Sequence, residues 1–212
     1  MKSNFYFTFI LILLSCTSKN ESVKTTLKKR IVGIQPYENI SIAETKKIAQ
    51  ALDSFYGCKS IVLPPIKHDK KSFISIKSPR YRADSIIRFQ NRTIPSHVDY
   101  IVGVTNSDIS TTKHDTKGNI EKPTWKYSDF GVMGLAYRPG NSAIISTFRL
   151  KHKNKKLAFT RFKKVTIHEF GHNLGLPHCP NKKCVMTAAA EKISTIDNEN
   201  LALCKSCKNK IN

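Results

Sequence analysis

Hydrophobic and polar residues follow a pattern that predicts strands and helices along residues 30–105. Residues 30–35 form an apolar run typical of a strand. Residues 41–56 place apolar side chains three and four positions apart, as an amphipathic helix does, with Ser41 as its cap and Gly57 as its stop. The other patterned segments are a strand at 58–63, a helix at 83–90 and a strongly apolar, central strand at 99–105.

The pattern changes after residue 105. Residues 106–130 are polar and show no periodicity, so we expect a surface loop there. Residues 143–150 predict another strand, and a helix is expected from near Asn154 to Leu174. With 212 residues the chain has room for one domain. The aspartates of the polar stretch match no cation-binding loop, and we expect them to be solvated: Asp108, Asp115 and Asp129.

The first residues have the pattern of a secretion leader. Residues 5–14 are apolar but too few to cross a bilayer, which takes about 20 residues. Residues 13–16 look like a bacterial lipoprotein cleavage box, with Cys16 as the acylated N-terminus after removal of 1–15. The alternative is an ordinary secretory signal. Residues 16–29 are polar and predict a tether, which would make the protein a membrane-anchored lipoprotein on the periplasmic or cell-surface side.

The composition is strongly basic. The formal net charge is +21, from 36 lysines and arginines against 15 aspartates and glutamates. No acidic residue occurs between Phe130 and His168, and this stretch is either a solvated basic face or a surface that steers acidic peptides or anionic membranes. No nucleic-acid motif is present, so no specific nucleic-acid partner is expected. The basic residues of the stretch are Arg138, Arg149, Lys151, Lys153, Lys155, Lys156, Arg161, Lys163 and Lys164.

The candidate chemistry lies in residues 168–178, which read H-E-F-G-H-N-L-G-L-P-H. In a helix, His168 and His172 lie one turn apart on one face, where two imidazoles can bind one Zn²⁺. Glu169 borders the same face and can act as a general base without being a ligand. The alternative is a surface helix that happens to carry two histidines.

The residues that follow the helix complete the motif. Gly175 accepts the left-handed conformation that ends helices, and Pro177 prevents the helix from resuming. His178 then returns as a third ligand. Three protein ligands leave a fourth position open for water or substrate, which is typical of a catalytic zinc.

The motif continues beyond His178, and its extension is specific. Cys179, Cys184 and Met186 follow, and Cys204 and Cys207 come after 17 further residues, giving H-E-x-x-H-x-x-G-x-x-H-C-x4-C-x-M-x17-C-x-x-C. This string resembles the archaemetzincin family of zinc metallopeptidases at every fixed position. The resemblance is strict over residues 168–207 and looser through 102–105, 134–136 and 146–150.

The resemblance implies an α+β, zincin- or metzincin-like fold, in which a mixed twisted sheet carries an active-site helix. One domain at 30–212 would divide into an N-terminal subdomain (30–175) and a small C-terminal subdomain (176–212). Met186 would supply the Met-turn, an apolar floor beneath the zinc. Strand 143–150 resembles the edge strand that pairs with extended peptides in related zincins.

The remaining cysteines have two interpretations. The resemblance implies that four of them hold a second, structural zinc, giving two Zn²⁺ ions per chain. In an oxidising compartment the same thiols could form disulfides instead. Cys58 lies outside any cluster and is expected to be a small buried hydrophobe. The four clustered residues are Cys179, Cys184, Cys204 and Cys207.

The expected function is therefore a monomeric zinc peptidase acting on peptide or protein substrates, with exo- and endopeptidase activity both open. The alternative is a basic protein that binds polyanions or membrane surfaces and uses zinc mainly for structure. Glu169 distinguishes the two, because a structural site has no need of a general base.

Overall fold

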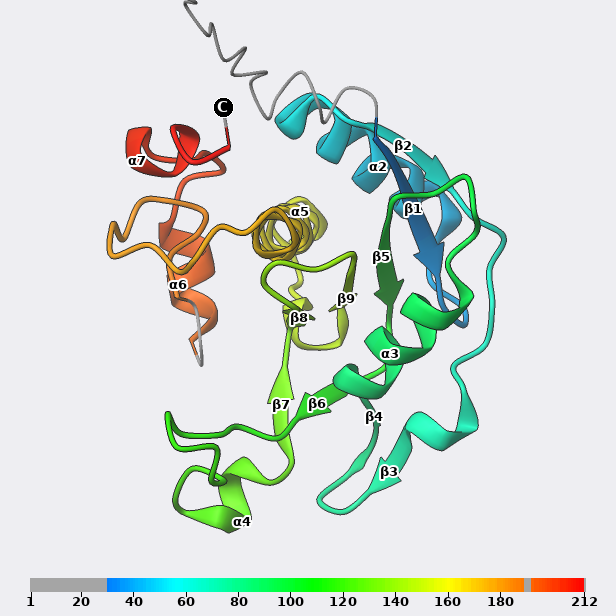
Figure 1. Ribbon diagram of the computed structural model, residues 1–212, viewed down its shortest axis with the longest axis vertical. Helices are drawn as coiled ribbons and strands as arrows, with labels where there is room; N and C mark the ends of the chain where they lie inside the picture. The colour runs from blue at the N-terminus through cyan, green and yellow to red at the C-terminus, as the bar shows by residue number, and fades with distance from the viewer. Residues whose placement is uncertain (1–29, 189–191, 212) are drawn as a thin grey trace, which may run out of the picture.

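Helix α5 (Lys155–Asn173) lies between a five-stranded sheet and the C-terminal segment, by which we mean the described residues after 175. Figure 1 views this helix nearly along its axis. The computed structural model describes residues 30–188 and 192–211. The first four strands of the sheet are parallel and the last is antiparallel to its neighbour, so the sheet is mixed, as expected. In spatial order the strands are β2 (Lys59–Val62), β1 (Ile31–Pro36), β5 (Tyr100–Thr105), β9 (Ser142–Ser146) and β8 (Gly134–Ala136).

Helices cover both faces of this sheet. Helices α2 (Ile42–Tyr56) and α5 share a core cluster with Val102 and Ile145, on one face. Helix α3 (Ala83–Thr93) shares a second cluster with Ile144, on the other face. Successive side chains of a strand point to opposite faces, so Ile144 and Ile145 are both fully buried. This two-sided burial explains why the central strands are apolar runs rather than alternating ones.

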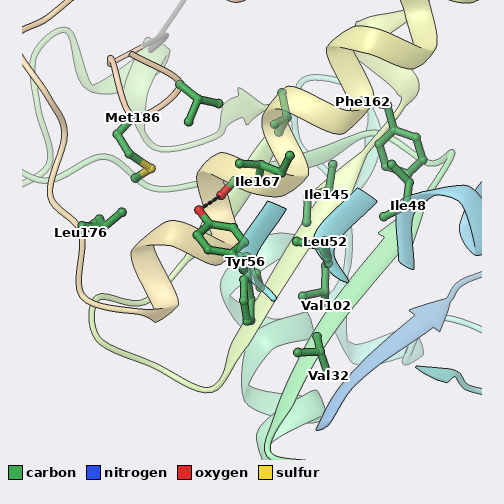
Figure 2. Packing of buried hydrophobic residues seen from close by; sticks show 14 of the residues in the cluster. Val32, Ile48, Leu52, Tyr56, Val102, Ile145, Phe162, Ile167, Leu176 and Met186 are labelled. Atoms are coloured by element: carbon green, nitrogen blue, oxygen red, sulfur yellow. Dashed lines mark hydrogen bonds between the residues drawn. The ribbon is translucent and has the colours of Figure 1, made fainter. Parts of the chain in front are cut away.

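Helix α2 begins and ends where the sequence predicts. The Ser41 side chain accepts a hydrogen bond from the backbone N–H of Glu44 at 3.3 Å, and Gly57 has a left-handed φ of 70°. The Tyr56 hydroxyl donates to the backbone oxygen of Ile167 at 2.8 Å, which ties α2 to α5 (Figure 2). The strands expected at 30–35, 58–63 and 99–105 and the helix expected at 83–90 are confirmed, with the helix extended to Thr93.

A second sheet forms beside the first and corrects the prediction of a loop at 106–130. Asp108 and Asp129 are 6% and 1% exposed, because arginines distant in sequence pair with them, so the expectation that they are solvated is wrong. Asp115 is exposed and caps a turn, as expected. The second sheet has the order β3 (Phe73–Ser75), β4 (Pro79–Arg82), β6 (Ile109–Thr111) and β7 (Phe130–Val132), with η1 (Lys70–Ser72) before β3 and α4 (Thr124–Tyr127) between β6 and β7.

The strand expected at 143–150 is shorter and lies elsewhere in the sheet. Strand β9 ends at Ser146, and a 3-10 helix, η2 (Phe148–Leu150), follows. Strand β9 pairs with β5 on one side and with β8 on the other, so it is not an edge strand. The edge beside α5 is β8, because the chain folds back after β8 and places β9 inside.

Helix α5 matches the predicted span. The Asn154 side chain caps it by accepting from the backbone N–H groups of Lys156 and Leu157. Lys153, Lys155 and Lys156 are exposed, but two cations on the same helix are buried, so a solvated face does not describe the whole basic stretch. Those two buried cations, Arg161 and Lys164, contact the C-terminal segment.

The C-terminal segment packs on α5 through both polar and apolar contacts. Arg161 forms two hydrogen bonds with the Asp197 carboxylate, at 2.7 and 2.6 Å. Lys164 donates to the backbone oxygens of Ile196 and Glu199, both at 2.6 Å. The segment contains α6 (Ile193–Asn198) and α7 (Lys205–Lys208).

Two predictions concern parts of the chain without a structural test. The leader at 1–15, Cys16 and the tether at 16–29 lie outside the described residues. The division into subdomains at residue 175 stays a prediction. Among the helices of the described ranges, none has the length and apolar character needed to span a bilayer.

Candidate metal centre and active site

Helix α5 and the turn after it bring the three predicted histidines together. His168 and His172 lie one helical turn apart, with their Nε2 atoms 3.0 Å from each other. Gly175 has a φ of 92° and ends the helix, and the chain then returns His178 to the same place. The ring centroid of His178 lies 5.4 Å from that of His168 and 4.8 Å from that of His172.

The hydrogen bonds of the first two histidines identify which nitrogens are available. The Nδ1 atom of His168 lies 2.7 Å from the backbone oxygen of Val185, and that of His172 lies 2.7 Å from the backbone oxygen of Leu176. A carbonyl oxygen only accepts, so each Nδ1 carries the proton of a neutral ring. Both Nε2 atoms then present lone pairs to one another, an arrangement that repels unless a cation lies between them.

Burial keeps these rings neutral. His168 and His172 are at most 9% exposed, and burial lowers the pKa of His168 to about 3. Burial also lowers the pKa of His172 and of His178, although His178 is the exposed member of the cluster. Neutral imidazoles with converging lone pairs, all within 4.8 Å, fit the three-histidine, open-position donor set of a catalytic zinc.

Glu169 lies beside the histidine cluster and against the edge strand. It is 9% exposed, and burial raises its pKa to about 8. Its side chain packs on Gly134 of β8, where an added Cβ would lie 2.6 Å from the Glu169 Cγ atom. A glycine at this position therefore permits the close approach of the carboxyl group to the strand. In the sequence, residues 134–136 belong only to the looser part of the family resemblance, which predicts no role for Gly134.

A cleft of about 640 Å³ contains the histidine cluster and Glu169. One wall follows the chain from Phe130 through Ala136, which includes β7 and β8. Arg149 and Glu199 also line the cleft, and the sequence did not identify either as a site residue. Both are brought there by long-range packing, for which the local sequence carries no signal.

The four clustered cysteines form a second centre. Their sulfur atoms lie within 4.8 Å of one another, and those of Cys179 and Cys204 are 3.7 Å apart. Four sulfurs about 2.3 Å from a tetrahedral zinc would be separated by about 3.8 Å, whereas a disulfide needs about 2.05 Å. Each of the four, and Cys58, is a free thiol among the described cysteines, and the spacing of the four clustered sulfurs is one that could hold a metal ion. Cys58 is 9% exposed, as expected of a buried hydrophobe.

Met186 packs beneath the active-site helix. It is fully buried, and its sulfur lies against Gly171, between the two helical histidines, where an added Cβ would come within 2.6 Å of it. Its backbone oxygen accepts a hydrogen bond from the N–H of Cys179 at 2.7 Å. Figure 2 shows the Met186 side chain in the core beside α5. Residue 186 thus contacts both the histidine helix and the cysteine cluster.

Comparisons with known proteins agree with this arrangement. The family model described as Peptidase family M54 matches residues 124–212. The archaemetzincin of Haloarcula marismortui is 27% identical over 189 residues, which cover 85% of this chain and 98% of the relative. The archaemetzincin of Haloquadratum walsbyi is 28% identical over 186 residues, covering 84% of this chain and 96% of the relative.

Solved structures show the same likeness. The crystal structure of the Archaeoglobus fulgidus archaemetzincin, complexed with malonate, matches with a TM-score of 0.69 and 27% identity, covering 85% of this chain and 99% of the other. The archaemetzincin structure from Methanopyrus kandleri matches with a TM-score of 0.71, covering 87% of this chain and 94% of the other, and at 20% identity it supports the fold alone. The motif, the two donor clusters and these matches lead to one conclusion: the chain is similar to the archaemetzincins over most of its length, and residues 124–212 match the model of Peptidase family M54.

Proposed function

We propose that the protein hydrolyses peptide bonds with a zinc ion held by His168, His172 and His178, and with Glu169 as its general base. The observation that carries the proposal is the position of Glu169. Its carboxyl group packs on Gly134 of the edge strand β8 and lines the same cleft as the three histidines. A purely structural metal site would have no use for a buried carboxyl group at this point.

Each residue has a distinct part in the reaction. When bound, zinc supplies Lewis acidity, which polarises the scissile carbonyl and lowers the pKa of a water molecule. The carboxylate form of Glu169, which a bound zinc ion would favour against the effect of burial, accepts a proton from the attacking water and delivers it to the departing amine. The backbone oxygens of Val185 and Leu176 hold His168 and His172 in one tautomer and orientation.

The sheet edge supplies the surface for substrate. Strand β8 pairs with β9 on one side, and an extended peptide that adds on its other side becomes a further strand of the sheet. Such pairing uses backbone hydrogen bonds and therefore accepts many side chains. It would bring the scissile bond across the strand from Gly134, next to Glu169.

Two further proposals follow from the cysteine cluster and the leader. Cys179, Cys184, Cys204 and Cys207 would hold a second zinc, which fixes the C-terminal segment beside His178. A monomer anchored through acylated Cys16 at the periplasmic or cell-surface side would accord with the leader. Replacing Cys16 with alanine should release it from the membrane fraction or leave it unprocessed, and unchanged fractionation would refute the anchor.

The test of the peptidase proposal is Glu169→Gln, which keeps the size of the side chain and removes the base. We expect peptide cleavage to fall by at least about 10²–10⁴-fold, with zinc content unchanged. Glu44→Gln is the matched control, because Glu44 is an exposed carboxylate on α2. If Glu169→Gln cleaves a peptide library as fast as the wild type does, the proposal fails.

A further inference from the structure

Arg149 is a cation at the cleft whose position is fixed. It belongs to η2, directly after β9, and its side chain is 36% exposed while lining the cleft. Its Nε and Nη2 atoms donate to the two carboxylate oxygens of Asp108, at 2.8 and 2.9 Å. A bidentate pair of this kind fixes both the place and the plane of the guanidinium group.

Asp108 is itself anchored from behind. Its side chain is 5% exposed, and the Nε atom of Arg80 lies 3.4 Å from one of its oxygens. Nη1 of Arg80 lies 3.7 Å from Asp129, whose side chain is fully buried. A solvated surface arginine needs no such support, whereas one that must present its guanidinium in a set direction does.

The guanidinium of Arg149 rests on β7 at Gly131. A Cβ atom added there would collide with the guanidinium group, so glycine is required for the contact. The same relation joins Gly134 of β8 to Glu169. Three residues of extended chain span at most about 10 Å. Arg149 and Glu169 therefore pack on two glycines of one stretch of chain, Gly131 and Gly134, whose Cα atoms are at most about 10 Å apart.

Part of the Arg149 guanidinium group is available to bind a ligand. Asp108 takes the side of the guanidinium formed by Nε and Nη2. Within the part of the chain that the structure describes, Nη1 has no hydrogen-bond partner. The edge formed by Nη1 and Nη2 matches the geometry of a carboxylate, which arginine binds through two parallel hydrogen bonds.

We propose that Arg149 binds a carboxylate of the substrate, two or three residues beyond the cleaved bond on its C-terminal side; this inference rests on the proposed peptidase function. The direction follows from the sheet. Gly131 precedes Gly134 in the chain, so a peptide that pairs antiparallel with β8 runs from Glu169 toward Arg149 in its own N-to-C direction. Antiparallel pairing is also the more stable kind.

The carboxylate has two sources with the same chemistry. It belongs either to an acidic side chain or to the free C-terminus of a peptide that ends at this distance. The first would make the protein an endopeptidase selective for acidic sequences. The second would make it an enzyme that removes short fragments from C-termini.

The experiment compares peptides that differ only in this carboxylate. One pair carries Glu or Gln at the second and third positions after the cleaved bond, in the middle of a long peptide. The other pair ends there, with a free or an amidated C-terminus. For each pair, the ratio of the two kcat/KM values is measured for wild type, Arg149→Met and Arg149→Lys. This ratio is independent of the fraction of active protein, so partial misfolding of a variant does not obscure it.

For wild type we expect the kcat/KM of the peptide with the carboxylate to exceed that of its partner by about 10–100-fold in at least one pair, which corresponds to the free energy of a charge-assisted hydrogen bond. Arg149→Met should bring that ratio close to one, and Arg149→Lys should leave an intermediate value because a point charge replaces the fork. Arg92→Met, which removes an exposed arginine at the end of α3, should keep the wild-type ratio. The pair that responds identifies the source of the carboxylate.

Several results would overturn the inference. They are a wild-type ratio near one in both pairs, a ratio unchanged in Arg149→Met, or a preference for acid on the N-terminal side of the bond. If wild type cleaves no peptide, the proposed function fails, and the inference is then decided by binding. Calorimetry on zinc-loaded Glu169→Gln, with and without Arg149→Met, measures the affinity for each acid and its amide. Equal affinities for acid and amide would overturn it.

Discussion

The Nδ1 atom of His168 lies 2.7 Å from the backbone oxygen of Val185, the residue that follows Cys184. The segment that carries a thiol of the cysteine cluster therefore also orients the first histidine of the other cluster. The backbone oxygen of Met186, one residue further, accepts from Cys179. The two centres are thus joined by three consecutive residues, and a disturbance of the cysteine cluster should reach the histidines.

The first prediction concerns metal content. Wild type should contain two zinc ions per chain, and His172→Ala should contain one. Cys184→Ser should lose the ion of the cysteine cluster and also bind zinc more weakly at the histidines, by about 10–100-fold, as loss of outer contacts does. Elemental analysis after gel filtration, followed by titration with a competing chelator, measures both effects. His97→Ala, at an exposed histidine, should keep two ions. One ion in wild type would contradict the second centre.

The second prediction concerns Gly134. A Cβ atom at this position would lie 2.6–3.0 Å from three atoms of the Glu169 side chain, so Gly134→Ala should displace the carboxyl group. Displacements of about 1 Å cost about 10²-fold in rate. We expect kcat to fall by about 10–100-fold with two zinc ions retained. Gly134→Ala should lower kcat by a smaller factor in the Glu169→Asp variant than in the wild type, because the aspartate side chain is shorter. Additive effects of the two substitutions in this double-mutant cycle would argue against direct contact.

The third prediction concerns Lys164, which is 6% exposed and donates to two backbone oxygens of the C-terminal segment. Lys164→Met keeps the apolar stem but leaves the oxygens of Ile196 and Glu199 without their donor. The free energy of unfolding should fall by about 1–3 kcal/mol. Lys156→Met, at an exposed position on the same helix, should change it by less than about 0.5 kcal/mol. Thermal unfolding with excess zinc compares the two, and equal stabilities would contradict a role for the buried amine.

The fourth prediction is a pH dependence of stability from His68, which is 6% exposed and stacks between Tyr37 and Tyr81. Burial lowers its pKa to about 4, against a raising effect of the Glu38 charge. Between that value and the unfolded pKa of about 6.5, the unfolded chain binds more protons. Stability is therefore full above pH 6.5 and is lost as the pH falls toward 4.

His68→Gln should remove this part of the pH dependence. At pH 5 the protonation of unfolded His68 costs wild type about 1–2 kcal/mol relative to pH 7.5, and the variant should lack this loss. The measured quantity is the difference in unfolding free energy between the two proteins at both pH values, in which effects of the shared zinc ligands cancel. A difference that does not change with pH would contradict the prediction.

The sequence predicts the parts of the site whose determinants are local. The spacing of His168, His172 and Gly175 depends only on helix geometry, and the structure has the helix and its end where the motif requires them. The span of α2 is predictable for the same reason, since Ser41 and Gly57 act on adjacent backbone.

The rest depends on residues far apart in the chain. Which strand forms the sheet edge is decided by pairing with β5 and β8, so β9 could not be excluded as the edge from its own residues. The burial of Asp108 depends on Arg149, 41 positions away, and an aspartate in a polar stretch looks solvated without its partner. Arg149 belongs to the basic stretch between Phe130 and His168. The sequence of that stretch does not show which basic side chains are exposed and which, like Arg149, are held in place by a carboxylate from elsewhere in the fold.

The contacts of Arg161 and Lys164 determine how the C-terminal segment is aligned along α5, in addition to stabilising its packing there. They lie three positions apart on one face of α5, where Arg161 contacts the Asp197 carboxylate and Lys164 contacts the backbone oxygens of Ile196 and Glu199. Apolar contacts tolerate sliding of one helix along another, but a shift of α6 by one residue would move the Asp197 carboxylate away from the buried guanidinium of Arg161. The C-terminal segment can therefore dock in a single register. Because Cys204 and Cys207 follow on the same segment, that register also sets where their thiols meet Cys179 and Cys184.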